Sequence, residues 1–200
     1  MQKTLSQHCY QCHGELVQMK NVRLDSPQNV KLHIIGDKQI NAFVSGGQQM
    51  FINTGLIIQT RNPNELIGVM AHETGHISGG HLARSGDMSK AATGTFVMTL
   101  GLGLLAALAG APDAAAMLIG NSSYFATLSV LGYTRVQESS ADQAAAGFLD
   151  KSGQSGKGLV EFFDNFRYQE VFSDAKRYPF FRSHPLSSDR IEALRVRVEA

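Results

Sequence analysis

The chain has 200 residues, of which 43% are hydrophobic, and this suffices for one domain with a substantial buried core. Its formal net charge is only +1, from 18 basic and 17 acidic residues. The two signs are mixed along the sequence, without the basic patch that a phosphate-backbone binder needs, so we expect no nucleic acid among the partners.

The N-terminal region predicts an amphipathic helix over 3–20. It has no apolar stretch of signal-peptide length, so either the protein is cytoplasmic or the chain begins after a removed segment. Both cysteines lie here with a histidine, as Cys9, Cys12 and His13, in the C-x-x-C-H spacing of covalent haem attachment. Three interpretations stay open: a haem site, a disulfide or reactive dithiol, and an inert segment, which we favour.

Short β-rich runs follow at 30–35, 40–44 and 49–57. Turn-forming residues separate them, Gly36-Asp37 and then Ser45-Gly46-Gly47. The pattern predicts a small three-stranded sheet with at least one hairpin.

A helix is predicted to begin after Asn62, which can cap it, with Pro63 at the first helical position. Glu65 can reach back as the acidic half of a capping box. The helix weakens or ends at Gly79-Gly80.

This predicted helix carries His72, Glu73 and His76 in the pattern H-E-x-x-H. Residues four apart differ by about 40° around a helix axis, so the two histidines project from one face and can share a metal ion. Glu73 lies about 100° from His72, where it can reach a water held by that ion. The pattern is typical of zinc peptidases, in which the glutamate takes the proton of the metal-activated water.

A catalytic zinc requires a third protein ligand. The nearby His81 misses by one position the third histidine of the metzincin pattern, although Gly79 fits the glycine of that pattern. On a continued helix His81 would lie about 180° from His72. We therefore interpret His81 as a packing or helix-end residue.

Glu138 is the best candidate for the third ligand. Asp142 lies four residues further on, so on a helix both carboxylates face the same way. Asp142 can then accept a hydrogen bond from the far nitrogen of a ligand histidine. The residues around Glu138 and Asp142 are small and apolar, which argues against the alternative that the two acidic residues simply face solvent.

Residues 91–134 contain a single charged residue, Asp113. The segment predicts either a hairpin of two membrane spans, or helices buried in the fold, or an apolar surface that rests on a membrane or partner. Its second half runs on into a helix that stops near Ser152-Gly153. Helices are also predicted over 158–170 and 188–199, joined by a loop-like aromatic stretch at 177–185.

Four segments resemble the HtpX-like and CAAX-prenyl-endopeptidase zinc metalloendopeptidases, a branch of the gluzincins: 40–57, 64–84, 138–145 and 183–191. The resemblance implies one zinc per chain, bound by His72, His76 and Glu138, with Glu73 as general base. It also implies that Asp142 touches a ligand histidine and not the zinc itself. It implies that 40–57 forms a hairpin beside the cleft, whose edge strand pairs with an extended peptide substrate. The match at Ser183-His184-Pro185 makes His184 a catalytic candidate, as a donor to the oxyanion or as a cap on the open metal position, with Arg190 nearby.

The expected fold is therefore α+β, a mostly helical zincin-type metallopeptidase with a small sheet. We expect a single catalytic domain over 1–200, in which 91–134 is an apolar helical insertion that contacts a membrane or envelope protein. The expected function is zinc-dependent hydrolysis of unfolded or misassembled envelope proteins, in the periplasm or at a membrane. The alternatives are a catalytically idle, chaperone-like binding module, against which the intact Glu73 argues, and a c-type haem protein.

Overall fold

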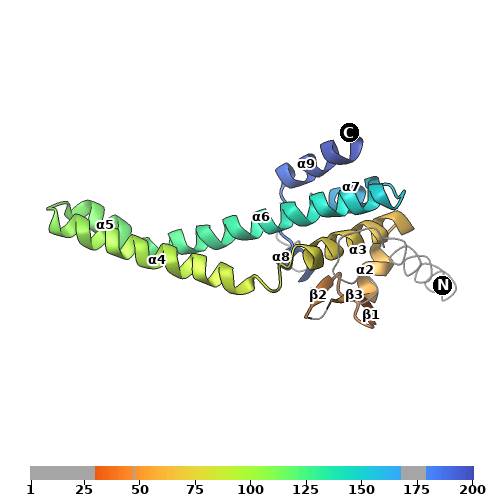
Figure 1. Ribbon diagram of the computed structural model, residues 1–200, viewed down its shortest axis with the longest axis horizontal. Coiled ribbons are helices and arrows are strands. Elements are labelled where there is room, and N and C mark those ends of the chain that lie inside the picture. Colours follow the sequence, from red (N-terminus) through yellow and green to blue (C-terminus); the bar gives the residue numbers. More distant parts are fainter. Residues whose placement is uncertain (1–29, 47, 168–178) are drawn as a thin grey trace. The chain divides into compact units, whose positions relative to one another are not determined.

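The computed structural model describes residues 30–46, 48–167 and 179–200. The helix predicted over 3–20, with Cys9, Cys12 and His13, lies outside these residues. The described chain is mostly helical and contains one small mixed sheet (Figure 1). The predicted α+β class is thereby confirmed.

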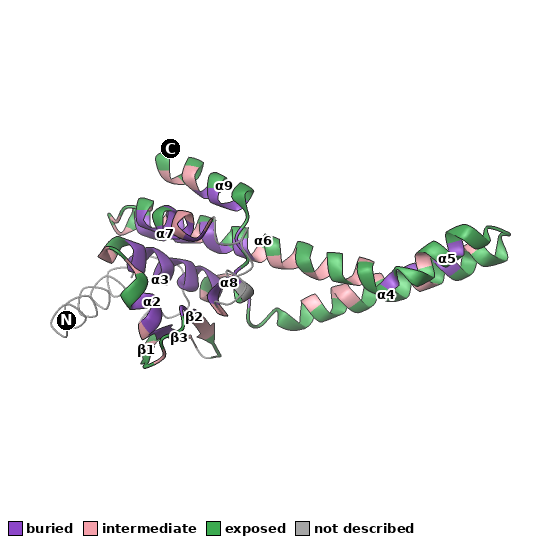
Figure 2. Ribbon diagram, turned by 180° about the vertical axis from the view of Figure 1, so that it is seen from behind, coloured by how far each residue is buried: buried purple, intermediate pink, exposed green. Residues whose placement is uncertain are grey.

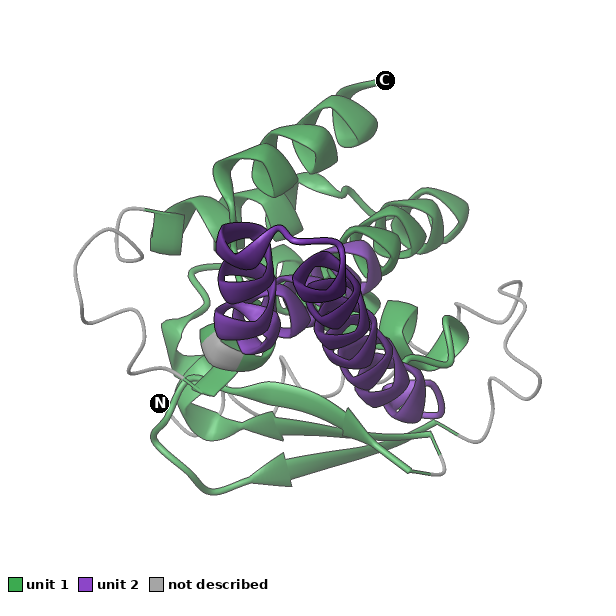
Figure 3. Cartoon of the chain, turned by 90° about the vertical axis from the view of Figure 1, so that its left-hand side faces the viewer, with its two compact units in different colours: residues 1–82, 138–200 green, residues 83–137 purple. Residues whose placement is uncertain are grey.

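The chain divides into two compact units (Figure 3). The first combines residues 1–82 with 138–200, and the second consists of residues 83–137. The apolar segment 91–134 thus falls inside the second unit. That the whole chain acts as one catalytic domain stays a prediction.

The sheet of the first unit has the strand order β1-β3-β2. Strands β2 (Ala42–Ser45) and β3 (Gln49–Asn53) form the predicted antiparallel hairpin, and β1 (Lys31–Ile35) pairs with β3 in parallel. The prediction of a strand over 49–57 was wrong in its second half, because helix α2 (Thr54–Gln59) begins directly after Asn53.

Helix α2 replaces the expected strand because of how its residues are packed. A Cβ atom at Gly55 would collide with the Lys38 carbonyl oxygen, so this backbone lies against the loop that precedes β2. Leu56 and Ile57 are both buried in the core, whereas Ile58 is 61% exposed. A short apolar run cannot distinguish strand from helix by periodicity alone.

Helix α3 (Pro63–Ser78) lies at the centre of the first unit, and every residue from Glu65 to His76 is buried. The side chain of Asn62 accepts a hydrogen bond from the Glu65 backbone N–H, as predicted for the cap. The Glu65 carboxylate accepts from the backbone N–H of Arg61, one residue earlier than the capping box predicts. These contacts fix where the helix begins.

Successive layers build the first unit around α3 (Figure 1). Helix α3 packs against β2 and also against α7 (Lys157–Arg167), and α7 packs against α9 (Ser188–Glu199). A Cβ at Gly68 would lie 2.7 Å from the Leu159 Cβ, so α3 and α7 approach closely. Buried residues accordingly gather on α3 and α7 (Figure 2).

The aromatic stretch predicted as a loop contains a short helix, α8 (Pro179–Ser183). Proline suits a first helical position, and the buried Phe180 and Phe181 join the core of the first unit. The expectation of an irregular connection at 177–185 was therefore wrong for 179–183.

The second unit contains α4 (Ser85–Leu108), α5 (Pro112–Gly120) and residues 122–137 of α6 (Ser122–Lys151). Helices α4 and α5 pack together. Helix α4 is long and apolar enough to cross a membrane, and 11% of its most apolar 18-residue stretch is buried. Helices α5 and α6, bent by 50° relative to each other, are long and apolar enough only when they are taken together as one span. Most of the exposed large hydrophobic side chains among the described residues belong to this unit.

Candidate metal centre

Four buried side chains in the first unit converge on one point: His72, His76, Glu138 and His184. Each offers one ligand atom, and these atoms all lie within 4.8 Å of one another. The two histidines of α3 face each other with their Nε2 atoms 3.1 Å apart. Glu138 on α6 faces both, with Oε2 lying 3.4 Å from the Nε2 of His72 and Oε1 lying 3.4 Å from the Nε2 of His76.

A close approach of two helices brings Glu138 to the histidine pair. A Cβ at Gly75 would lie 2.6 Å from the carbonyl oxygen of Ala141 and 2.9 Å from its Cα. Only glycine therefore allows α3 to lie this near to α6, within one turn of Glu138. No local sequence pattern indicated this role of Gly75.

His184 reaches the same point from the segment after α8. Its backbone N–H donates to the carbonyl of Phe180, which holds the residue at the end of that helix. Its Nδ1 lies 3.3 Å from the Nε2 of His72 and 3.1 Å from a carboxylate oxygen of Glu138. Its Nε2 lies 3.4 Å from Glu73. His184 thus belongs to the cluster, and its two expected roles, as a donor to the oxyanion or as a cap on the open metal position, stay predictions.

Asp142 and Arg190 form a chain of contacts behind the cluster. An oxygen of Asp142 lies 2.9 Å from the Nδ1 of His72, and both carboxylate oxygens accept from the Arg190 guanidinium. Arg190 also contacts Glu138 at 2.9 Å and stacks over the Phe163 ring, 4.9 Å from its centroid. The predicted catalytic candidate Arg190 thus lies against the acidic residues of the site.

Burial and mutual contacts set the charges of the metal-free cluster. Burial alone would lower the pKa of His72, but hydrogen bonds to Asp142 and Glu138 outweigh it and raise that pKa to about 9. Burial and the charge of His72 lower the pKa of His76 to about 2. Burial would raise the pKa of Glu138, yet hydrogen bonds with His184 and His72 hold it well below its usual range. His72 therefore carries a proton that a bound metal ion would replace.

Glu73 lies beside the cluster and is completely buried. Among the described residues neither of its carboxylate oxygens has a hydrogen-bond partner. Burial raises the pKa of Glu73. A buried carboxylate that has no hydrogen-bond partner among these residues and lies next to four candidate metal ligands is suited to exchange a proton with a water molecule.

The cluster fits a zinc ion. Tetrahedral zinc with ligand bonds of about 2.0–2.1 Å sets neighbouring ligand atoms about 3.3 Å apart. The nitrogen and oxygen atoms of the four residues are separated by 3.1 to 3.4 Å across the contacts given above. Two or three imidazoles with one carboxylate also match the donor types that zinc prefers.

His81 is buried and lies just beyond the end of α3. Its Nδ1 is 2.9 Å from the Nδ1 of His76, and the two rings meet edge to face. The sequence analysis predicted a packing or helix-end residue and did not anticipate contact with a ligand histidine.

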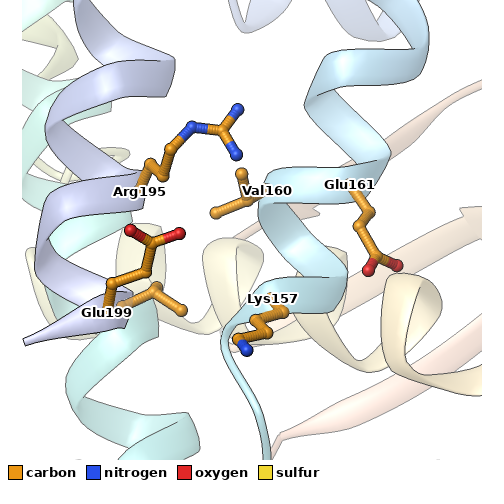
Figure 4. A pocket seen from close by; sticks show the side chains of 6 residues that line it. Lys157, Val160, Glu161, Arg195 and Glu199 are labelled. Atoms are coloured by element: carbon orange, nitrogen blue, oxygen red, sulfur yellow. The ribbon is translucent and has the colours of Figure 1, made fainter.

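A surface pocket lies elsewhere in the first unit, between α7 and α9 (Figure 4). It is lined by Lys157, Val160, Glu161, Arg195, Val198 and Glu199. None of these residues belongs to the cluster, and their charges of both signs give the pocket no evident ligand.

A comparison with protein families matches residues 11–198 to "Peptidase family M48". The chain belongs to peptidase family M48. The membership confirms the resemblance to HtpX-like metalloendopeptidases, and the buried cluster of His72, His76, Glu138 and His184 fits a metal site.

Several curated proteins are similar to most of this chain. The "Putative beta-barrel assembly-enhancing protease" of Vibrio cholerae is 33% identical over 168 residues, which cover 82% of this chain and 34% of that protein. The "Beta-barrel assembly-enhancing protease" of Escherichia coli is 28% identical over 165 residues, 82% of this chain and 33% of the relative. "Metalloprotease YcaL" of Escherichia coli is 28% identical, covering 86% and 63%. The chain spans about a third of the length of the first two proteins.

Proposed function

We propose that the chain is a zinc-dependent endopeptidase domain, with one zinc held by His72, His76 and Glu138. The observation that carries the proposal is the convergence of these three buried side chains beside the Glu73 carboxylate, which is buried without a hydrogen-bond partner in the described part of the chain. The M48 membership supports the same chemistry.

Bound zinc supplies a Lewis acid that polarises the scissile carbonyl and lowers the pKa of water. Glu73 takes the proton of the attacking water and passes it to the leaving amine. Its raised pKa suits both transfers, because a catalytic acid and base work best when the pKa approaches the ambient pH. Its burial keeps competing water away from that proton.

His184 acts on the substrate side of the site. The Nδ1 of His184 lies 3.3 Å from the Nε2 of His72 and 3.1 Å from a Glu138 oxygen, which supports a resting state in which His184 caps the open metal position. When a peptide enters, His184 gives way and donates a hydrogen bond to the oxyanion that forms at the scissile carbonyl. Arg190 holds Asp142, and Asp142 orients His72.

The substrate binds as an extended strand along β2. In the described part of the chain β2 pairs with β3 on one side only, and it packs against the helix that carries His72 and Glu73. Backbone pairing along that edge would bring the scissile bond close to the site and would place few demands on substrate side chains.

The substrates are unfolded or misassembled polypeptides of the cell envelope. Two relatives are named for enhancing β-barrel assembly, which supports an envelope location, in the periplasm or at a membrane. The exposed apolar side chains of the second unit support contact with a membrane or envelope protein through 91–134.

Metal analysis combined with a casein cleavage assay tests the proposal on the wild type and Glu73→Gln. We expect about one zinc per chain in both proteins and cleavage only by the wild type, since Glu73 is not a ligand. Zinc in both without cleavage by either would instead indicate an idle binding module. Absence of metal from both would refute the zinc site.

A further inference from the structure

Helix α3 ends in a turn that carries the chain back over its own last residues. The N–H of Gly80 donates to the carbonyl of Ile77, and the N–H of His81 donates to the carbonyl of His76. Gly80 has φ of +62°, in the left-handed region that favours glycine. This pair of bonds is the Schellman motif, which places the side chain at His81 over the side chain at His76.

The imidazoles of His81 and His76 contact each other through their Nδ1 atoms. The Nδ1 of His81 lies 2.9 Å from the Nδ1 of His76, and the ring planes are inclined by 78°. The Nε2 of His76 faces the other way, toward His72 and Glu138. His81 therefore contacts the nitrogen of His76 that points away from the ligand cluster.

Gly79 provides the space for this contact. A Cβ atom at Gly79 would collide with Nε2 of the His81 ring. The Gly79 backbone has φ of −74° and ψ of −10°, which any residue adopts, so its conformation does not require glycine. Both glycines thus allow His81 to contact His76: Gly80 adopts the backbone conformation of the turn, and Gly79 leaves space for the His81 ring.

The chemistry of a ligand histidine then fixes the direction of the hydrogen bond. An imidazole that binds a metal through Nε2 carries its proton on Nδ1, and the partner of that N–H sets the tautomer and the ring orientation. For His72 the atom in that place is a carboxylate oxygen of Asp142 at 2.9 Å. For His76 it is the Nδ1 of His81.

We propose that His81 is a positioning residue for the metal site, whose Nδ1 accepts the Nδ1–H of His76 and so holds Nε2 of His76 ready for the metal. The inference rests on the proposed metal site and adds a residue that touches no metal itself. It assigns the two ligand histidines different partners, a carboxylate for one and a neutral imidazole for the other.

The test compares Co²⁺ affinity and the visible absorption spectrum of bound Co²⁺ in the full chain and two variants. His81→Ala removes the acceptor, whereas His81→Asn keeps an oxygen near the position of Nδ1. We expect His81→Ala to bind Co²⁺ about 10- to 100-fold more weakly with an altered spectrum, because such partners contribute about that much to metal affinity. His81→Asn should recover most of the affinity.

Two further variants separate this role from simple helix-end packing. Ser78→Ala removes a hydroxyl at the same helix end, which bonds the Gly75 carbonyl, and should leave Co²⁺ affinity unchanged. Gly79→Ala should weaken Co²⁺ binding in the wild type but have little further effect in His81→Ala, because both substitutions act through one ring. Thermal unfolding of each metal-free variant verifies that it folds.

Equal affinities for the wild type and a folded His81→Ala would overturn the proposal, as would a His81→Asn variant no better than His81→Ala. A wild type that binds Co²⁺ without cleaving casein would contradict the proposed peptidase function alone, since the affinity comparison needs no cleavage. A wild type that binds no Co²⁺ or Zn²⁺ would refute both.

Discussion

At the scale of single residues, the site places acidic and imidazole groups where water cannot compensate their charges. Glu138 is 3% exposed, and its carboxylate contacts His72, His76, His184 and Arg190. Because an unpaired buried charge costs several kcal/mol, each member of the cluster depends on the others. A bound cation would satisfy the same lone pairs and replace the proton of His72.

Glu138→Gln tests the third ligand. We expect zinc affinity to fall by more than about 100-fold, because the substitution removes the charge of a ligand. Loss of a residue that only hydrogen-bonds to a ligand weakens metal binding by about 10- to 100-fold. Competition with a chromophoric chelator measures the affinity. The matched control is Asp150→Asn, an exposed carboxylate on the same helix, which should bind zinc like the wild type. Full zinc affinity in Glu138→Gln would exclude the proposed ligand set.

His184→Ala separates a ligand from a catalytic donor. Three zinc ligands remain, so we expect about one zinc per chain at saturating zinc. The kcat for a casein-derived peptide should fall about 10²- to 10³-fold, the cost of removing one oxyanion donor. Loss of zinc would make His184 a permanent ligand, and a faster reaction would make it only a cap on the resting site.

At the scale of secondary structure elements, the sequence predicted the helix ends that depend on neighbouring residues, such as capping side chains and proline. Asn62 and Pro63 begin α3 where the capping pattern indicated, and Ser188–Glu199 forms the last helix as predicted. The H-E-x-x-H spacing predicted that His72 and His76 share a face because a helix fixes that relation. These inferences required no knowledge of distant contacts.

Elements that depend on tertiary packing were not predictable in this way. Helix α2 follows β3 directly at a point where Gly55 lies against Lys38, and a local sequence pattern does not reveal such a contact between separate segments. His81 is a buried helix-end residue, as predicted, but its contact with His76 was not predicted, because the Schellman turn at Gly80 reverses the chain there. The spacing of His76, Gly80 and His81 carries the signal for that turn.

Gly75→Ala tests the close approach of α3 and α6. The added methyl group would lie 2.6 Å from the Ala141 carbonyl, so the helices must separate and Glu138 moves from the histidines. We expect a loss of about 1–3 kcal/mol in the free energy of unfolding of the metal-free chain, with weaker zinc binding. Urea unfolding and chelator competition measure the two effects.

Gly147→Ala is the matched control for that substitution. It lies on α6 and an added Cβ meets no atom within 4 Å. Helix propensity favours alanine over glycine by up to about 1 kcal/mol, so this variant should be at least as stable as the wild type with unchanged zinc affinity. Similar losses in both variants would contradict the close-approach argument.

At the scale of the whole molecule, the two units differ in what they bury. The first encloses the hydrophobic core and the cluster of candidate metal ligands, whereas the second leaves many large apolar side chains exposed, with Leu108 at 86%. Such a surface is typical of contact with lipid or a partner. This difference supports the proposal that the first unit carries the chemistry and that the second contacts a membrane or a partner protein.

A triple variant tests this division. Leu104, Leu105 and Leu108 are each more than 60% exposed on α4, and their replacement by Glu should reduce sedimentation of the chain with vesicles of phosphatidylethanolamine and phosphatidylglycerol by more than about 10-fold. Zinc content should not change. Val196→Glu in the first unit, where Val196 is 64% exposed, should bind vesicles like the wild type. Equal vesicle binding by the triple variant would refute a lipid contact through α4.

The first unit is assembled from two stretches of chain, 1–82 and 138–200, and each contributes ligand groups. A single proteolytic nick within 83–137 would consequently leave two fragments, one with the histidine pair and the other with Glu138 and His184. Zinc would then act as a non-covalent cross-link between the fragments, and a chelator would promote their dissociation.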